Sequence, residues 1–525
     1  MCGILLSNEQ TCSSDKFKRA LDLMDHRGPD ATGYMKTCGV HLGHKRLKII
    51  DLDDRSNQPF LSKNSRHVII FNGEIYNFKQ LQQRHSLRGL RTTCDTEVVL
   101  ELFLNLGPEF VKQLDGMFSL AIVDTLTGEV FAARDRLGVK PLFIYQSARS
   151  LILSSEVGPI LDLTGDDAVD EVGVRQYLKL RTFFNDRTIY RNIKSFPAGC
   201  YLQSGKVVRY WEYNPAPQEA PEDGEIESLV QNSIDLRVMA DVSVGSYLSG
   251  GVDSSIIAAL CGRAHSWTVG FHGHNEFEWA KLAACHIGTD HHEVLIDEGE
   301  FADIASQMVK KRREPLSVPN EVLLYRMTQN VKEKNTVVLS GEGADELFFG
   351  YDRIFRWAAS AKVWDLETFA QLYSYSPRPD LEIVEDAVAP FLRFGDPLWI
   401  VSSFFQVAHL HGLLRRLDNS TMMCSVEARV PFVDSIALID RLAGVSAEYR
   451  MAGGIPKAPL KRIFGGLLPA EIIGRPKVGF PVPLELIDFP GIAGGRPFDR
   501  WLRFNLQELF GDNQFGEDIA GQVKN

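Results

Sequence analysis

The 525-residue sequence lacks any apolar run near the ~20 residues that a membrane-spanning helix needs, and no basic stretch followed by an apolar one opens it. Its eight cysteines form no CxxC pair, so we expect free thiols, a reducing cytoplasm and no zinc site. A positive charge excess is also missing, since the formal net charge is −11. This balance argues against a nucleic-acid or anionic-membrane partner.

The chain is longer than one hydrophobic core usually serves, so at least two domains are expected. A run rich in proline and acidic residues at 214–224 is typical of a linker. We therefore predict a first domain over 2–212, a linker over 213–224 and a second domain over 225–525.

Before the linker, the pattern predicts antiparallel strands between layers of helix. Strand-like stretches lie at 40–52, 67–75, 118–124, 129–133 and 142–145, and helical ones at 17–25 and 96–114. After the linker, strand and helix alternate, which favours a parallel sheet that holds its ligand at the carboxyl ends of the strands.

One strand-turn-helix corner organises the second half. Ser249-Gly-Gly-Val-Asp-Ser-Ser255 follows a buried strand predicted over 242–248 and begins a helix. Free backbone N–H groups at such a helix start form an anion site suited to phosphate. A plain structural corner is the alternative, but this one also supplies the Asp253 carboxylate and three hydroxyls. No Gly-Lys-Ser/Thr follows, so it is not a P-loop.

A second glycine-rich corner, Ser340-Gly-Glu-Gly-Ala-Asp-Glu-Leu347, follows the strand predicted over 336–339. Carboxylates beside a triphosphate are costly unless magnesium lies between them. We therefore predict Asp253 and Asp345 as magnesium ligands. The alternative is that these acids only cap the helix predicted over 344–349. Adjacent His291 and His292 point to opposite faces of a strand, so no metal role is assigned to them.

The N-terminus reads Met1-Cys2-Gly3-Ile4. Removal of Met1 would leave Cys2 with both a thiol and an α-amine of pKa near 8, which is a built-in general base. A chance cysteine is the alternative on these residues alone.

Four further blocks accompany Cys2: Gly43-His-Lys-Arg-Leu47, Phe71-Asn-Gly-Glu-Ile-Tyr-Asn77, Cys94-Asp-Thr-Glu97 and Arg134-Asp-Arg-Leu-Gly138. Together they resemble the N-terminal-nucleophile (class II) glutaminase domain of glutamine amidotransferases, which implies an αββα sandwich. By resemblance, Cys2 attacks the glutamine amide, and Asn72 and the Gly73 N–H stabilise the oxyanion. The implied glutamine-binding residues are Arg46 for the α-carboxylate, Glu74 and Asp95 for the α-ammonium, and Ile49, Ile50, Asn72 and Gly73 around them. Taken singly, Asn72-Gly73 is equally a hairpin turn, Asp95 a helix cap and Arg46 a surface charge.

The first corner looks like the PP-loop of the ATP pyrophosphatase family. With the second corner, Ser425-Val-Glu-Ala-Arg-Val-Pro-Phe-Val-Asp434, Lys457-Ala-Pro-Leu-Lys461 and Arg475-Pro-Lys-Val-Gly-Phe480, it resembles the synthetase half of glutamine-hydrolysing asparagine synthetases. The resemblance covers residues 2 to about 485 and implies a Rossmann-like parallel-sheet domain with added helices. It implies that ATP is bound by Leu248, Ser249, Gly250, Gly251, Asp253, Ser254, Ser255, Val269, Ser340 and Gly341. It also implies that Lys457 stabilises charge on the phosphate and that Glu342 deprotonates the attacking ammonia.

The implied reaction is an ATP-dependent amide ligation of EC class 6.3.5. Glutamine supplies ammonia, ATP and Mg²⁺ convert a carboxylate into an acyl-adenylate, and the ammonia displaces AMP. Aspartate is the acceptor we expect, with Glu427 and Arg429 as acceptor-binding candidates or as an internal salt bridge. A uronic-acid sugar or a specialised metabolite stays open as the acceptor, because the segment Ser317-Val-Pro-Asn320 departs from the family pattern. A non-catalytic relative is a third alternative, and a homodimer is left open.

Overall fold

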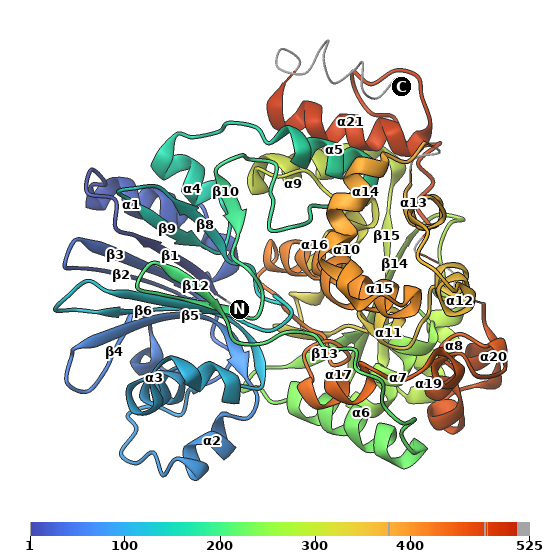
Figure 1. Ribbon diagram of the computed structural model, residues 1–525, viewed down its shortest axis with the longest axis horizontal. Coiled ribbons are helices and arrows are strands. Elements are labelled where there is room, and N and C mark those ends of the chain that lie inside the picture. The colour runs from blue at the N-terminus through green and yellow to red at the C-terminus, as the bar shows by residue number, and fades with distance from the viewer. Residues whose placement is uncertain (1, 376–377, 477–478, 480, 512–525) are drawn as a thin grey trace.

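The computed structural model describes residues 2–375, 378–476, 479 and 481–511. The first half contains the strands β1 (Gly3–Ser7), β2 (Ala31–Thr37), β3 (Val40–Arg46), β4 (Phe60–Leu61), β5 (His67–Ile75), β6 (Gly116–Asp124), β7 (Val130–Arg134), β8 (Phe143–Gln146), β9 (Leu151–Ser154), β10 (Ile193–Ser195), β11 (Cys200–Gln203) and β12 (Lys206–Arg209). They form two antiparallel sheets, in the orders β10-β8-β9-β1-β3-β2 and β12-β11-β7-β6-β5-β4. The two sheets are stacked on each other (Figure 1).

Helices cover both outer faces of this stack. They are α1 (Ser14–Asp22) and α4 (Val157–Thr164) on the first sheet, and α2 (Phe78–Arg84) and α3 (Asp95–Leu106) on the second. Alternation along β1 explains the layers: Ile4 and Leu6 pack between the sheets, while Leu5 packs with Phe17 and Leu21 of α1. The αββα arrangement predicted for the first half is therefore confirmed.

Two predicted elements of this half are shorter in the structure. The strand expected over 40–52 ends at Arg46, because the loop that follows has Asp51 at a positive φ of 51° and its carbonyls accept hydrogen bonds from Arg46. The helix expected over 96–114 ends at Leu106, where Gly107 has a φ of 66°, and the chain continues as a 3-10 helix over Gly107–Gln113.

The second half is built on a parallel sheet. Its strands are β13 (Val244–Tyr247), β14 (His265–Phe271), β15 (Asp290–Ile296), β16 (Val337–Leu339) and β17 (Glu427–Arg429), in the order β15-β14-β13-β16-β17. The helices around it are α6 (Asp223–Arg237), α7 (Val252–Cys261), α8 (Phe277–Ile287), α9 (Glu298–Arg312), α10 (Asn320–Val331), α11 (Ala344–Leu347), α17 (Ile436–Leu442), α18 (Ala447–Arg450), α19 (Ala458–Phe464), α20 (Ala470–Gly474) and α21 (Pro497–Phe510). The predicted parallel sheet is confirmed.

A group of helices between β16 and β17 completes this half. They are α12 (Asp352–Ser360), α13 (Leu366–Tyr373), α14 (Leu381–Val388), α15 (Pro397–Ser403) and α16 (Leu410–Met422). The first four pack around a separate aromatic core that includes Phe355, Phe369 and Phe404, whereas α16 packs on α10 and β17. A π-helical turn, Phe404–His409, leads directly into α16, and such turns are frequent at functional sites. Figure 1 places α16 beside the sandwich of the first half.

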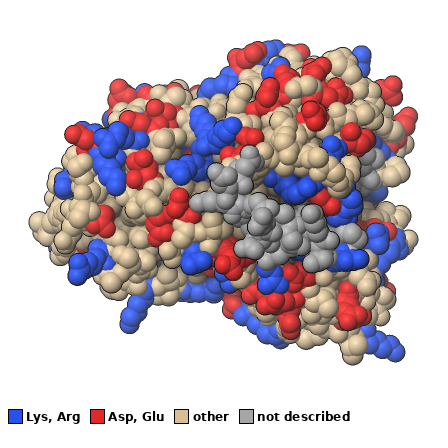
Figure 2. All heavy atoms as spheres, turned by 90° about the horizontal axis from the view of Figure 1, so that it is seen from above, with Lys and Arg blue, Asp and Glu red and all other residues tan. Residues whose placement is uncertain are grey.

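The segment predicted as a linker, 213–224, packs against the second half. The Gln218 N–H donates to the Gly444 carbonyl at 2.9 Å, and the Tyr213 hydroxyl donates to the Ala443 carbonyl at 3.2 Å. Within the described ranges, no helix combines the length and apolar character needed to cross a membrane. On the face seen in Figure 2, basic and acidic side chains are interspersed.

Candidate active sites in the two halves

Cys2 lies immediately before β1, and β5 supplies its neighbours. The Cys2 backbone N–H donates to the Asn72 side-chain oxygen at 2.9 Å, so the strand positions this amide beside the residue that removal of Met1 would make N-terminal. Gly73 follows in β5, where a Cβ would lie 2.3 Å from the Met117 carbonyl oxygen. Only glycine fits there. Both Asn72 and Gly73 lie within β5, so the hairpin-turn alternative is wrong. Burial raises the pKa of the Cys2 thiol.

Arg46, at the end of β3, holds the loop beside Cys2. Its guanidinium donates to the Asp53 carbonyl and to the Asn57 side-chain oxygen, both at 2.8 Å. These bonds fix the loop that carries Ile49 and Ile50. Arg46 is 4% exposed, so the surface-charge alternative is wrong.

Two buried carboxylates, Glu74 of β5 and Asp95 at the start of α3, lie in the same pocket. Asp95 accepts a hydrogen bond from the Ile75 N–H at 2.9 Å. Burial raises the pKa of Asp95 to about 6. Burial, and then the charge of Asp95, raises the pKa of Glu74 well above its ordinary value. Two acids held in this way favour binding of a cation such as an ammonium group.

The cavity that these residues enclose has a volume of about 30 Å³. It brings together Cys2, Arg46, Ile49, Ile50, Gly73, Glu74 and Asp95, with Leu47, Gln58, Phe71, Cys94, Thr96 and Glu427 completing the lining. Gln58 was not predicted. Its side-chain oxygen accepts from the Phe71 N–H at 2.6 Å and so ties the loop to β5.

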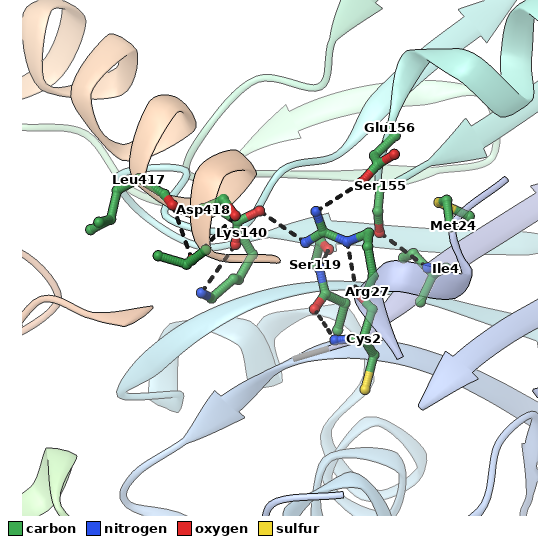
Figure 3. Close-up of polar contacts among 12 residues, drawn as sticks. Cys2, Ile4, Met24, Arg27, Ser119, Lys140, Ser155, Glu156, Leu417 and Asp418 are labelled. Atoms are coloured by element: carbon green, nitrogen blue, oxygen red, sulfur yellow. Dashed lines mark hydrogen bonds and ion pairs between the residues drawn. The ribbon is translucent and has the colours of Figure 1, made fainter. Parts of the chain in front are cut away.

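Sequence reasoning also missed Arg27, which connects Cys2 to the second half (Figure 3). Its Nε donates to the Cys2 carbonyl at 3.0 Å, and its two terminal nitrogens contact Glu156 at 3.2 Å and Asp418 of α16 at 2.9 Å. Although burial acts to raise it, His26 and Arg27 hold the pKa of Glu156 down to about 2. Lys140 adds a second ion pair to Asp418 at 3.4 Å. In the sequence, the His26-Arg-Gly-Pro stretch indicated only a turn.

Glu427 and Arg429 also belong to this region, where the structure shows one of the two alternatives left open for them. They are two residues apart in β17, so both side chains point to the same face of the sheet. Arg429 contacts Glu427 at 2.6 Å and Glu74 at 3.2 Å, and it is fully buried. Glu427 lines the Cys2 cavity. The internal salt bridge is therefore the arrangement observed, and we do not keep the two residues as acceptor ligands.

The two glycine-rich corners of the second half lie against each other. A Cβ on Gly341 would be 3.1 Å from both the Asp253 Cβ and the Ser254 N. Gly250 has a φ of 72°, and a Cβ there would lie 2.4 Å from the Trp279 carbonyl carbon. Ser249 and Ser254 share a hydrogen bond at 3.1 Å that closes the first loop.

The other predicted ATP-binding residues surround these corners. Leu248 and Val269 are buried at the neighbouring strands β13 and β14, and the Leu248 N–H donates to the Trp267 carbonyl at 2.8 Å. Ser255 is buried in the first turn of α7 beside Gly251, and Ser340 directly follows β16. The corners thus bring the predicted residues to the carboxyl edge of the sheet.

Lys457 lies between the two predicted magnesium ligands. Its Nζ contacts the Asp253 and Asp345 carboxylates, each at 2.5 Å. Although burial acts to lower it, these acids raise the pKa of Lys457 above its ordinary value. Lys457 has a φ of 57°, a left-handed conformation that is costly for a non-glycine residue and concentrated at functional sites. Gly350 makes room for this group, because a Cβ there would lie 2.4 Å from the Lys457 Cε.

The donor set fits a magnesium ion shared with phosphate. Asp253 and Asp345 offer only carboxylate oxygens, which Mg²⁺ prefers, and they converge on one point occupied by a cationic nitrogen. Across the described part of the chain, no group of three or more His, Cys, Asp or Glu side chains is placed to hold a metal ion. Two protein carboxylates alone would therefore leave the remaining positions to phosphate and water.

Glu342, the predicted base, follows Gly341 and pairs with an arginine that the sequence did not indicate. Arg416 of α16 donates to the Glu342 carboxylate at 3.0 Å. One helix thus contacts both sites: Arg416 reaches Glu342, and Asp418 reaches Arg27 and through it Cys2. These contacts span dozens to hundreds of residues, so no local pattern reveals them.

Comparison with known proteins gives two family matches. Residues 1–211 match the glutamine amidotransferase domain, and residues 225–491 match asparagine synthase. A putative glutamine-hydrolysing asparagine synthetase of Mycobacterium tuberculosis is 31% identical over 92% of this chain and 88% of its own length. Glutamine-hydrolysing asparagine synthetase 1 of Bacillus subtilis is 28% identical over 100% and 92%, respectively. Asparagine synthetase B of Escherichia coli is 29% identical over 91% and 82%.

Proposed function

Because the chain belongs to the asparagine synthase family, we propose that it is a glutamine-dependent amide ligase. It hydrolyses glutamine in the first half and uses the ammonia to amidate an ATP-activated carboxylate in the second. The observation that carries this proposal is the double contact of α16, which is tied to Cys2 through Asp418 and Arg27 and to Glu342 through Arg416. A cysteine pocket and a phosphate corner joined by one helix support two coupled half-reactions.

In the first half-reaction, the α-amine of Cys2 takes the thiol proton, and the sulfur attacks the side-chain amide carbon of glutamine. Asn72 and the Gly73 N–H stabilise the oxyanion. Ammonia leaves as a γ-glutamyl thioester forms, and water then releases glutamate. Glu74 and Asp95 hold the α-ammonium, and Arg46 holds the α-carboxylate. These roles are supported by the placement of all six residues around one cavity or against Cys2.

In the second half-reaction, an oxygen of the acceptor carboxylate attacks the α-phosphorus of ATP, and pyrophosphate leaves. A carboxylate is inert to ammonia, so this mixed anhydride is required. Ammonia then attacks the acyl carbon, AMP leaves, and Glu342 takes a proton. Lys457 stabilises negative charge on the phosphate. Asp253 and Asp345 would hold Mg²⁺, which when bound neutralises triphosphate charge.

The relatives are named asparagine synthetases, and asparagine is the product that amidation of the aspartate side chain gives. A different carboxylate is the second candidate, and a specific cavity described below favours it. All eight cysteines are free, which supports a reducing, cytoplasmic location. The assembly to test in solution is a homodimer.

Cys2→Ala tests the two-site scheme. With acceptor acid, ATP and magnesium present, the variant should lose glutamine-dependent pyrophosphate release by at least about 10³-fold, because it lacks the nucleophile. Release driven by ammonium chloride should be unchanged. Cys38→Ala, at an exposed cysteine, is the matched control. Equal loss with glutamine and with ammonia would contradict the scheme.

A further inference from the structure

A cavity of about 430 Å³ borders the reacting end of the ATP site. Arg416, which pairs with Glu342 at 3.0 Å, is part of its lining. So is Tyr351, which directly follows the Gly350 that lies against Asp345 and Lys457. Residues 317–320, the segment that departs from the family pattern, form another wall. An acceptor in this cavity would present its carboxylate beside Glu342 and the phosphate corner.

Among the residues that the structure describes, the lining of this cavity carries two arginines and no acid. Its residues are Leu180, Arg181, Thr182, Ser317, Val318, Pro319, Asn320, Tyr351, Tyr373, Tyr375, His409, Gly412, Leu413, Arg416, Gly479, Val482, Leu484 and Phe498. Three carboxylates contact residues of this lining, and each one is engaged. Glu321 accepts hydrogen bonds from the Ser317 and Val318 N–H groups and pairs with Arg312 at 2.6 Å. Glu342 pairs with Arg416, and Glu346 accepts a hydrogen bond from the Tyr351 hydroxyl at 2.6 Å and lies 3.8 Å from His409.

Arg181 is the cation that the rest of the cavity does not neutralise. Its guanidinium lies 3.1 Å from the centroid of the Tyr375 ring. Over the ranges that the structure describes, no carboxylate forms an ion pair with Arg181 and its buried Nε lacks a hydrogen-bond partner. An anionic or strongly polar acceptor group would satisfy it.

Aromatic rings supply much of the remaining wall. Tyr375 and Phe498 pack with ring centroids 5.2 Å apart, and Tyr373 donates to or accepts from the His409 ring at 2.9 Å. His409 closes the π-helical turn that precedes α16. The volume falls in the range of roughly 300–1,000 Å³ that is typical of pockets for drug-sized ligands, well beyond the needs of a four-carbon amino acid.

We propose that the acceptor is a carboxylic acid that carries an aromatic or other flat apolar body and no free α-ammonium group. This inference rests on the proposed function and narrows its acceptor. The ammonium of aspartate would enter a site with two guanidinium groups and no carboxylate free to balance it, which is a costly burial of charge. An apolar ring would instead bury its faces against the tyrosine and phenylalanine walls. The bonds made and broken are those of the amidation above, with AMP as the leaving group and the proton taken by Glu342.

Three acids separate the possibilities: aspartate, succinate, which has the same skeleton without the ammonium, and benzylsuccinate, which adds a ring. The full-length protein is assayed for pyrophosphate release with ATP, magnesium and ammonium chloride, so that glutamine hydrolysis is not needed. We expect kcat/KM for succinate to exceed that for aspartate by about tenfold or more, and benzylsuccinate to exceed succinate. Aspartate equal to or better than both other acids would overturn the inference and leave the proposed function intact. No release above the acid-free control with any acid would overturn both.

A substitution at Leu413 should reverse the preference between aspartate and succinate, because Leu413 lines the cavity one helical turn before Arg416. Leu413→Asp adds the missing carboxylate and should raise kcat/KM for aspartate relative to succinate by about tenfold. Leu413→Asn, which has the same size and no charge, should not. Arg181→Gln provides an independent variant, expected to raise KM for benzylsuccinate about tenfold. Glutamate formation from glutamine reports that each variant is folded. An unchanged acid preference in Leu413→Asp together with an unchanged KM in Arg181→Gln would refute the assignment of this cavity.

Discussion

The two sites differ in how far they are assembled without a ligand. Around Cys2, the cavity is only about 30 Å³, and Arg46, Gln58 and Asp95 are fixed by hydrogen bonds to the backbone. Around Lys457, the lysine neutralises the very carboxylates that a metal would need, beside a cavity of about 430 Å³. The first site is built for one small ligand. The second must exchange internal ion pairs for contacts with ATP and an acceptor.

The largest expected effect comes from Lys457→Met, which should break the second site alone. Pyrophosphate release should fall about 10³-fold with either ammonia source, because charge on the phosphate is no longer stabilised. Glutamate formation from glutamine should continue. Lys461→Met, one turn further along α19, is the matched control. Loss of glutamate formation of the same size would show that the two sites are not separable in this way.

Asp418→Asn changes a residue of the second half but should lower glutamine turnover in the first half, with an effect of intermediate size. It leaves the buried Arg27 without one of its two carboxylates, so we expect a loss of about 3–5 kcal/mol in unfolding free energy. Glutamine turnover should fall up to about 10²-fold through misplacement of Cys2. Pyrophosphate release with ammonium chloride measures the other site and should change least.

Asp22, an exposed acid that pairs with the buried Lys45, gives the control for Asp418. Asp22→Asn should cost no more than about 1 kcal/mol, because Lys45 keeps its contact with Asp25. Equal losses with glutamine and with ammonium chloride in Asp418→Asn would assign Asp418 a purely structural role.

The smallest expected effect is the pH dependence of glutamine binding, which depends on the Asp95 carboxylate of the first site. The pKa of Asp95 is raised from 3.8 to about 6, so the carboxylate is protonated at lower pH and holds an ammonium poorly. Below pH 6, affinity for glutamine should fall about tenfold per pH unit. Titration of glutamine binding to the Cys2→Ala protein measures this directly.

The raised pKa of Asp95 also makes the unfolding free energy depend on pH. Because the pKa of Asp95 is higher in the folded state, its contribution is complete below 3.8 and is lost as pH rises through about 6. The unfolding free energy of the ligand-free protein should therefore fall by about 3 kcal/mol across this window. Asp95→Asn should flatten the slope, whereas Asp235→Asn, at an exposed acid, should not. A slope unaltered in Asp95→Asn would argue against this origin.

The sequence predicted the features that depend on local residue patterns. The glycine-rich corners, the strand that carries Asn72 and Gly73, and the antiparallel and parallel halves all follow from period, turn residues and motif. Lys457 was harder, because its own neighbours indicate a surface helix, yet it is 7% exposed between two acids.

Other features could not be predicted because they depend on distant contacts. Arg27 and Asp418 are 391 residues apart in the chain, and neither has a distinctive neighbourhood. The sequence left Arg429 and Glu427 open as acceptor-binding charges or as an internal salt bridge. The direction in which their side chains point depends on the packing of β17 against the first half. The acid-free cavity likewise draws its walls from segments that the sequence separates widely.

Helix α16 limits how freely the two halves can be recombined. Arg416 and Asp418 are two residues apart and serve different sites, so the helix belongs to the second half by sequence and to both halves by contact. A chimera that joins residues 1–211 of this chain to the synthetase half of a relative would keep glutamine turnover only if that relative carries a carboxylate at the position of Asp418. Modular exchange, in evolution or in engineering, therefore has to carry α16 along with the glutamine-hydrolysing half.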